Sequence, residues 1–99
     1  VDQGIRYVLA TLGGEGAVLI SAEGAWWAKH EPVTVRSTVG AGDCSLAGFL
    51  IAHERGASPQ DALVQAVAHG SAAASLPGTR VPALEATTPQ KVTVQTLAV

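Results

Sequence analysis

Apolar and polar positions in the first third of the chain alternate in short runs that glycines interrupt. The almost continuously apolar residues 5–12 predict a strand, and glycines at 13–16 end it. Residues 17–21 and 25–29 predict a second and a third strand, separated by a turn at 22–24. Three short strands joined by glycine turns are typical of a meander at the edge of a sheet.

The apolar period then changes to that of a helix. No proline occurs between Asp43 and Arg55, and apolar residues recur there at helical spacing. Leu46, Phe49, Leu50 and His53 fall at this spacing. Because Gly56 is a natural C-terminal stop, we expect a helix over residues 43–55.

A second helix start follows at Ser58, which can cap a helix, with Pro59 suited to its first turn and Asp61 completing a capping box. This helix should extend to about Ser75. Its expected apolar face consists mostly of small residues, which favours close packing or a nearby ligand. The face comprises Leu63, Ala66, Val67, Gly70 and Ala74.

The remaining segments predict extended or irregular structure. Pro32 begins a fourth extended piece at 33–36, prolines make 79–89 irregular, and the alternating residues 91–97 predict a last strand. Strands followed by two helices fit part of an α/β layered domain.

Composition limits the classes of function. The 99 residues make one small domain, and 47% hydrophobic residues with a mean hydropathy of +0.29 exclude a disordered chain. The net charge is -2 and the basic residues are scattered, which argues against nucleic acid or an anionic membrane as the main partner. Cys44 is the only cysteine, so a disulfide framework is excluded and a reducing, cytoplasmic compartment is expected. Neither a membrane-spanning stretch nor a signal peptide is visible in the sequence.

The most informative segment is the glycine-rich turn that leads into the first helix. Gly40 and Gly42 let the backbone approach a ligand closely, and the first N–H groups of a helix form an anion site. Such a turn can stabilise the charge of a transferring phosphoryl group. Asp43 at its mouth is either a helix-capping carboxylate or a base that takes a proton from an attacking hydroxyl.

Residues 37–50, STVGAGDCSLAGFL, resemble the second signature of the PfkB/ribokinase family of carbohydrate kinases. The resemblance implies that Asp43 is the catalytic base and that the backbone of Gly40, Ala41 and Gly42 forms the anion hole. It also implies an α/β fold, the C-terminal part of a ribokinase-like three-layer α/β/α sandwich. All 99 residues would be its ATP-binding and catalytic segment, without the N-terminal sugar-binding part.

The resemblance extends to two segments that would hold ATP. Residues 11–16, TLGGEG, resemble the nucleotide loop of the family, although alone they would suggest a hairpin turn. Residues 67–74, VAHGSAAA, resemble the helix beside the adenine, although tight helix packing explains small residues equally well. The implied ATP-binding residues are Thr11, Gly13, Gly14, Glu15, Gly16, Val67, Gly70 and Ser71.

Two metal ions are also implied. Magnesium would bridge the phosphates of ATP. Residues 76–80, LPGTR, resemble a loop that, with the segment before Asp43, holds a monovalent cation such as K⁺, mainly through backbone carbonyls. The implied positions are Ser37, Val39, Ala73, Leu76, Gly78 and Arg80.

The resemblance covers residues 5–81 and implies ATP-dependent phosphoryl transfer to a hydroxyl of a sugar phosphate, foremost fructose 1-phosphate to fructose 1,6-bisphosphate. Tagatose 6-phosphate, fructose 6-phosphate or another sugar or nucleoside are alternatives. A different class of function is a non-catalytic nucleotide-binding fragment, or a remnant that pairs with another chain. We expect the 99 residues alone to be inactive, and the parent enzyme to be a possible homodimer.

Several other residues have simpler interpretations. Cys44 is expected to be a small packing residue, and His69 to lie on the helix surface. Of Trp26 and Trp27, one should pack inward, because neighbouring side chains in a strand point to opposite faces.

Overall fold

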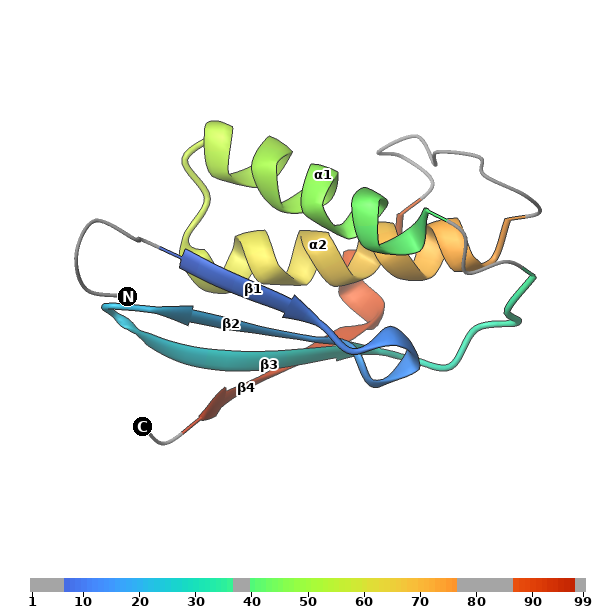
Figure 1. Ribbon diagram of the computed structural model, residues 1–99, viewed down its shortest axis with the longest axis horizontal. Helices are drawn as coiled ribbons and strands as arrows, with labels where there is room; N and C mark the ends of the chain where they lie inside the picture. The colour runs from blue at the N-terminus through green and yellow to red at the C-terminus, as the bar shows by residue number, and fades with distance from the viewer. Residues whose placement is uncertain (1–6, 37–39, 77–86, 98–99) are drawn as a thin grey trace.

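The computed structural model describes residues 7–36, 40–76 and 87–97, which form an antiparallel sheet with two helices on one face (Figure 1). The strands are β1 (Tyr7–Thr11), β2 (Ala17–Ser21), β3 (Gly24–His30) and β4 (Val92–Leu97), and they lie in that order across the sheet. Three of them form the predicted meander. The last strand, also predicted, pairs antiparallel with β3.

The helices α1 (Ala41–Glu54) and α2 (Pro59–Ala74) form a hairpin in which α2 lies against β2 and β3 and α1 packs along α2 (Figure 1). Short 3₁₀ turns, η1 (Gly13–Glu15) and η3 (Pro89–Lys91), follow β1 and precede β4. The sheet and one helical layer agree with the expected α/β class. No described helix has the length and apolarity needed to cross a membrane.

The core lies between the sheet and α2. Leu19 of β2 pairs with Trp26 of β3, and both side chains are buried on the helix-facing side, whereas Ile20 is exposed on the other side. Leu63 of α2 is fully buried in the same cluster. Trp27 is half-buried, so the expectation that one tryptophan packs inward is confirmed, with Trp26 as that residue.

Local signals at the helix ends are confirmed. The Ser58 hydroxyl accepts a hydrogen bond of 3.1 Å from the backbone N–H of Asp61, which caps α2. Gly56 has φ +81°, and its N–H donates to the carbonyl of His53, which ends α1. The helix α1 begins two residues before Asp43, after the left-handed Gly40.

The α1–α2 contact depends on a glycine and corrects one expectation. A side chain at Gly48 would lie 2.6 Å from Nδ1 of His69 and 2.8 Å from the carbonyl oxygen of Gln65. His69 is therefore buried between the helices, with 3% of its surface exposed, and not on the helix surface as predicted. Its Nδ1 lies 2.8 Å from Nε2 of Gln65, so the ring keeps a polar partner in the interior.

The buried face of α1 also differs from the predicted one. Leu46 and Leu50 are 50% and 49% exposed, and of the predicted apolar positions only Phe49 is buried. The residues of α1 that pack inward share only Phe49 with the predicted face, and the others are small: Cys44, Ser45, Gly48 and Phe49. Because small residues let α1 approach α2 closely, they rather than the leucines define the contact. The burial of Cys44 confirms its interpretation as a packing residue.

The predicted extended piece at 33–36 belongs to no strand of the sheet. It connects β3 to the turn before α1. The N–H of Arg36 donates a hydrogen bond of 2.8 Å to the carbonyl of Ala74, which joins this connection to the C-terminal end of α2. Its backbone is thus held by a helix terminus instead of a sheet partner.

Candidate active site

The turn before α1 has the geometry of an anion site. Gly40 has φ +78°, a left-handed conformation that favours glycine, and a side chain there would meet no atom within 4 Å. Backbone conformation, and not lack of space, therefore accounts for this glycine. The first helical hydrogen bond of α1 is donated by the N–H of Cys44 to the carbonyl of Gly40. The N–H groups of residues 41–43 precede that bond and point out of the helix end.

Asp43 lies in the first turn of α1 and is exposed to solvent. It is the third helical residue, whereas the N-cap position is occupied by Gly40, so Asp43 is not the N-cap residue. Within the described part of the chain, its carboxylate has neither a hydrogen bond nor an ion pair. The carboxylate is thus available to a ligand that approaches the helix end.

Burial raises the pKa of the neighbouring Cys44 thiol above its ordinary value, and the negative charge of Asp43 raises it further. Cys44 is therefore a protonated packing residue at neutral pH. A raised pKa argues against a nucleophilic thiolate at this helix end.

The glycine loop between β1 and β2 is closed by backbone hydrogen bonds. The N–H of Leu12 donates to the carbonyl of Gly16 at 2.8 Å, and the N–H of Gly16 donates to that of Gly13 at 3.1 Å. A side chain at Gly16 would collide with the carbonyl of Ala28, because the loop lies directly against β3. Gly16 has φ +92° as well, so both conformation and space require glycine there.

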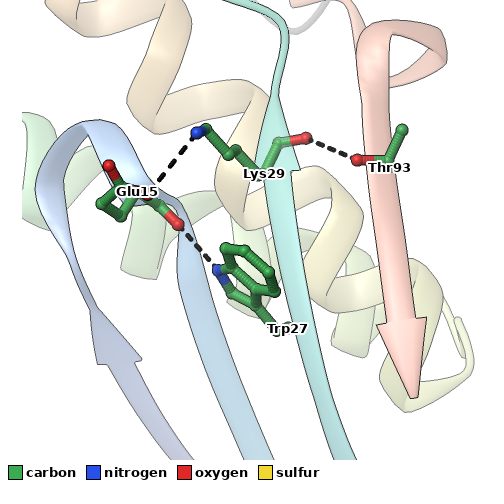
Figure 2. A network of polar contacts seen from close by, with 4 residues as sticks. All are labelled: Glu15, Trp27, Lys29 and Thr93. Atoms are coloured by element: carbon green, nitrogen blue, oxygen red, sulfur yellow. Dashed lines mark hydrogen bonds and ion pairs between the residues drawn. The ribbon is translucent and has the colours of Figure 1, made fainter. Parts of the chain in front are cut away.

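Side chains of β3 hold the same loop from the side (Figure 2). The indole N–H of Trp27 donates a hydrogen bond of 2.7 Å to the backbone carbonyl of Glu15. Nζ of Lys29 lies 3.4 Å from Oε2 of Glu15, and the Thr93 hydroxyl of β4 donates to the carbonyl of Lys29. The loop is therefore anchored to the sheet through its backbone, and an exposed charge pair lies beside that contact.

These elements enclose a cavity of about 420 Å³, within the usual range for small-molecule sites. The glycine loop, the beginning of α1 and the small-residue face of α2 each contribute to its lining. Nine of the residues predicted from the sequence lie around it: Thr11, Gly13, Gly14, Gly16, Ala41, Gly42, Val67, Gly70 and Ser71. Segments far apart in the sequence thus converge on one space.

Other predicted residues do not line the cavity. Gly40 and Asp43 belong to the turn at its edge, and the Glu15 side chain is directed to Lys29. Ala73 is buried and Leu76 is half-buried, both at the end of α2. The remaining predicted cation ligands lie outside the described residues: Ser37, Val39, Gly78 and Arg80.

The structure also adds lining residues that sequence reasoning missed. Most come from the end of β3 and from the connection that follows it: Lys29, His30, Glu31, Pro32, Val33 and Val35. The alternation of valines in this segment is the available signal, but alternation by itself predicts only an extended piece. Ser45 of α1 lines the cavity too, and a side chain at Gly70 would collide with its hydroxyl. Gly70 therefore has a packing role and a cavity-lining position together.

Comparisons with known proteins identify the family and the fold. A family model described as pfkB family carbohydrate kinase matches residues 1–86. A 1-phosphofructokinase of Haloferax volcanii is 46% identical over 83 residues, which is 84% of this chain and 27% of that protein. The chain thus spans only about a quarter of that relative's length.

Two solved structures are similar in fold. A putative phosphofructokinase from Staphylococcus aureus superimposes with a TM-score of 0.86 at 34% identity, covering 97% of this chain and 31% of the other. Phosphofructokinase-2 from Escherichia coli, solved in complex with potassium, has a TM-score of 0.78 at 32% identity, covering 87% of this chain and 27% of the other. Over the shared part, the sheet and helix hairpin correspond to part of these larger molecules.

Proposed function

Because the chain belongs to the pfkB family of carbohydrate kinases, we propose that it carries the ATP-binding and phosphoryl-transfer part of a sugar-phosphate kinase. The observation that carries this proposal is the cavity between the glycine loop, the α1 turn and the small face of α2. Each of these three elements supplies a different part of what a nucleotide requires.

The adenine would lie on the α2 side of the cavity. Gly70 and Ser71 line the cavity there without a bulky side chain, Val67 offers an apolar contact, and Pro32 and Val33 line the cavity from the connection after β3. The phosphates would lie toward the glycine loop and the end of α1. The Gly40–Gly42 backbone would then stabilise charge on the transferring group.

In this arrangement Asp43 takes the proton of the acceptor hydroxyl as that oxygen attacks phosphorus. Its exposure and the lack of an internal partner among the described residues support the role, because a paired carboxylate would be held away from substrate. The first-turn position also suits a carboxylate, since the helix dipole stabilises negative charge there.

Magnesium, when bound with the nucleotide, would neutralise phosphate charge. Within the described ranges no group of three His, Cys, Asp or Glu side chains could form a metal cage. That agrees with Mg²⁺ held chiefly by phosphate oxygens and water. A K⁺ site remains part of the proposal. The Arg36–Ala74 hydrogen bond supports it, because it joins the two segments that adjoin the predicted ligands, and a similar structure contains potassium.

The proposed acceptor is fructose 1-phosphate, with fructose 1,6-bisphosphate as product. It is supported by the 46% identity to a 1-phosphofructokinase. Fructose 6-phosphate and tagatose 6-phosphate are the alternatives. A non-catalytic nucleotide-binding role is the candidate of a different class.

Two measurements test the proposal. Calorimetry should detect Mg-ATP binding to the 99-residue chain, and the Asp43→Asn variant should retain that binding. Phosphoryl transfer to a panel of sugar phosphates should be assayed with the chain alone and mixed with the N-terminal part of the Haloferax relative. We expect Asp43→Asn to reduce activity of the mixture by about 10²–10⁴-fold. Full activity of that variant would falsify the base assignment, and binding without transfer in every mixture would favour the non-catalytic role.

A further inference from the structure

Lys29 has an unusual position among the charged residues of the cavity. It is the one lysine or arginine among the described lining residues, yet its ammonium group lies beside a carboxylate of the glycine loop. The Lys29 and Glu15 side chains are 43% and 71% exposed, and their N–O separation is 3.4 Å (Figure 2). An exposed pair of this kind is weak, so another anion can replace the carboxylate.

The loop does not depend on this pair for its position. The indole of Trp27 holds the backbone carbonyl of Glu15 at 2.7 Å, and the Leu12–Gly16 hydrogen bond closes the turn. These contacts remain if the lysine leaves. Lys29 can therefore move while the loop stays against β3.

Among the described lining residues, the other charged and titratable groups leave Lys29 as the available cation. Both ring nitrogens of His30 have partners, the Glu31 carbonyl at 2.7 Å and the Thr88 hydroxyl at 2.7 Å. Glu31 lines the cavity and is acidic, as is Glu15 beside it. A polyphosphate in this space would lie near these acidic residues, and a cation beside the glycine loop offsets part of that repulsion.

We propose that Lys29 is a phosphate-binding residue that exchanges its contact with Glu15 for the phosphate oxygens of the nucleotide. This inference rests on the proposed nucleotide site and adds a specificity determinant to it. Lys29 distinguishes a nucleotide by its phosphate charge, while the cavity between the loop and α2 takes the nucleoside. Glu15 holds the lysine at the cavity edge until a phosphate displaces it.

The test compares Mg-ATP and adenosine binding to the 99-residue chain by calorimetry. We expect Lys29→Gln to weaken Mg-ATP binding about fivefold and adenosine binding less than twofold, because a charge-assisted contact to phosphate is lost. Glu15→Gln should tighten Mg-ATP binding about twofold, because it removes both a competitor for the lysine and a repulsive charge. Higher salt should reduce both effects.

The opposite signs of the two substitutions separate this role from a structural one. If the pair merely anchored the loop, both variants would weaken ATP and adenosine alike, and the inference would be refuted. Lys91→Gln is the matched control, because Lys91 is an exposed lysine of η3 outside the cavity lining, and it should bind like the wild type. Wild-type binding that Lys29→Gln leaves unchanged would reject the role of Lys29 alone. Absence of ATP and adenosine binding in the wild type would reject the nucleotide site as well.

Discussion

Gly48→Ala should destabilise the protein, because the added methyl group would collide with atoms of α2. The new carbon would lie 2.6 Å and 2.7 Å from Nδ1 and Cγ of His69 and 2.8 Å from the Gln65 carbonyl oxygen. The imidazole is buried between the helices, and the carbonyl is part of the α2 backbone. Relief therefore requires the two helices to separate, and rotation of one side chain is not enough.

The expected magnitude is about 2 kcal/mol of unfolding free energy. Overpacking a close contact costs about 1–3 kcal/mol, and backbone involvement places this site at the upper end. Replacing a mid-helix glycine by alanine offsets about 1 kcal/mol of this cost, because alanine has the higher helix propensity. For a domain of this size, a loss of about 2 kcal/mol lowers the melting temperature by about 8–16 °C.

Thermal unfolding followed by far-UV circular dichroism measures this effect. Gly42→Ala is the control for stability, because the nearest atom to its added carbon, the Thr11 hydroxyl oxygen, lies at 3.9 Å. In a His69→Ala background, the cost of Gly48→Ala should fall by about 1 kcal/mol, since two of the three closest atoms are gone. A Gly48→Ala protein that melts at or above the wild-type temperature would refute the reasoning.

Two further predictions concern α2 and the thiol. Ser58→Ala should lower the unfolding free energy by about 1 kcal/mol, because it removes the cap on the Asp61 N–H. Ser58→Gly should lower it by only a few tenths of a kcal/mol. Urea titrations of both variants check this. The raised pKa of Cys44 means that the folded state keeps the thiol proton to higher pH than the unfolded chain. Its contribution to stability is therefore complete below the ordinary thiol pKa and is lost as pH rises through the folded value. Urea unfolding at neutral and alkaline pH should show a smaller alkaline loss for Cys44→Ala than for the wild type; equal losses would contradict the assignment.

Elements with strong local signals were predictable from the sequence. Residues 17–21 form a strand with the expected bounds, and α2 starts after Ser58 as its capping pattern indicates. The strand at the C-terminal end follows its alternation of valine and polar residues. In each case neighbouring residues contain the whole signal, so no tertiary contact is needed to interpret it.

Features that depend on contacts between distant segments were not predictable in the same way. Helical spacing identifies apolar positions on α1, but the approach of α2 at Gly48 selects the face that packs, which leaves Leu46 exposed and buries His69. The family resemblance named half of the residues that line the cavity. It did not name Lys29, because a lysine in a strand pattern has no local feature that relates it to the glycine loop.

The position of β4 in the sheet has a consequence for how the chain folds. Val92 pairs with His30, across the whole helix hairpin, whereas α1 and α2 are joined by a short turn. Contacts between distant residues carry a larger loop-closure entropy and form late. We expect the hairpin and the β1–β3 meander to gain protection in pulse-labelling hydrogen exchange before the amides of β4. Simultaneous protection would contradict that order. Until β4 docks, the backbone edge of β3 is an unpaired template for other strands, so the interval before docking is when this chain is most exposed to aggregation.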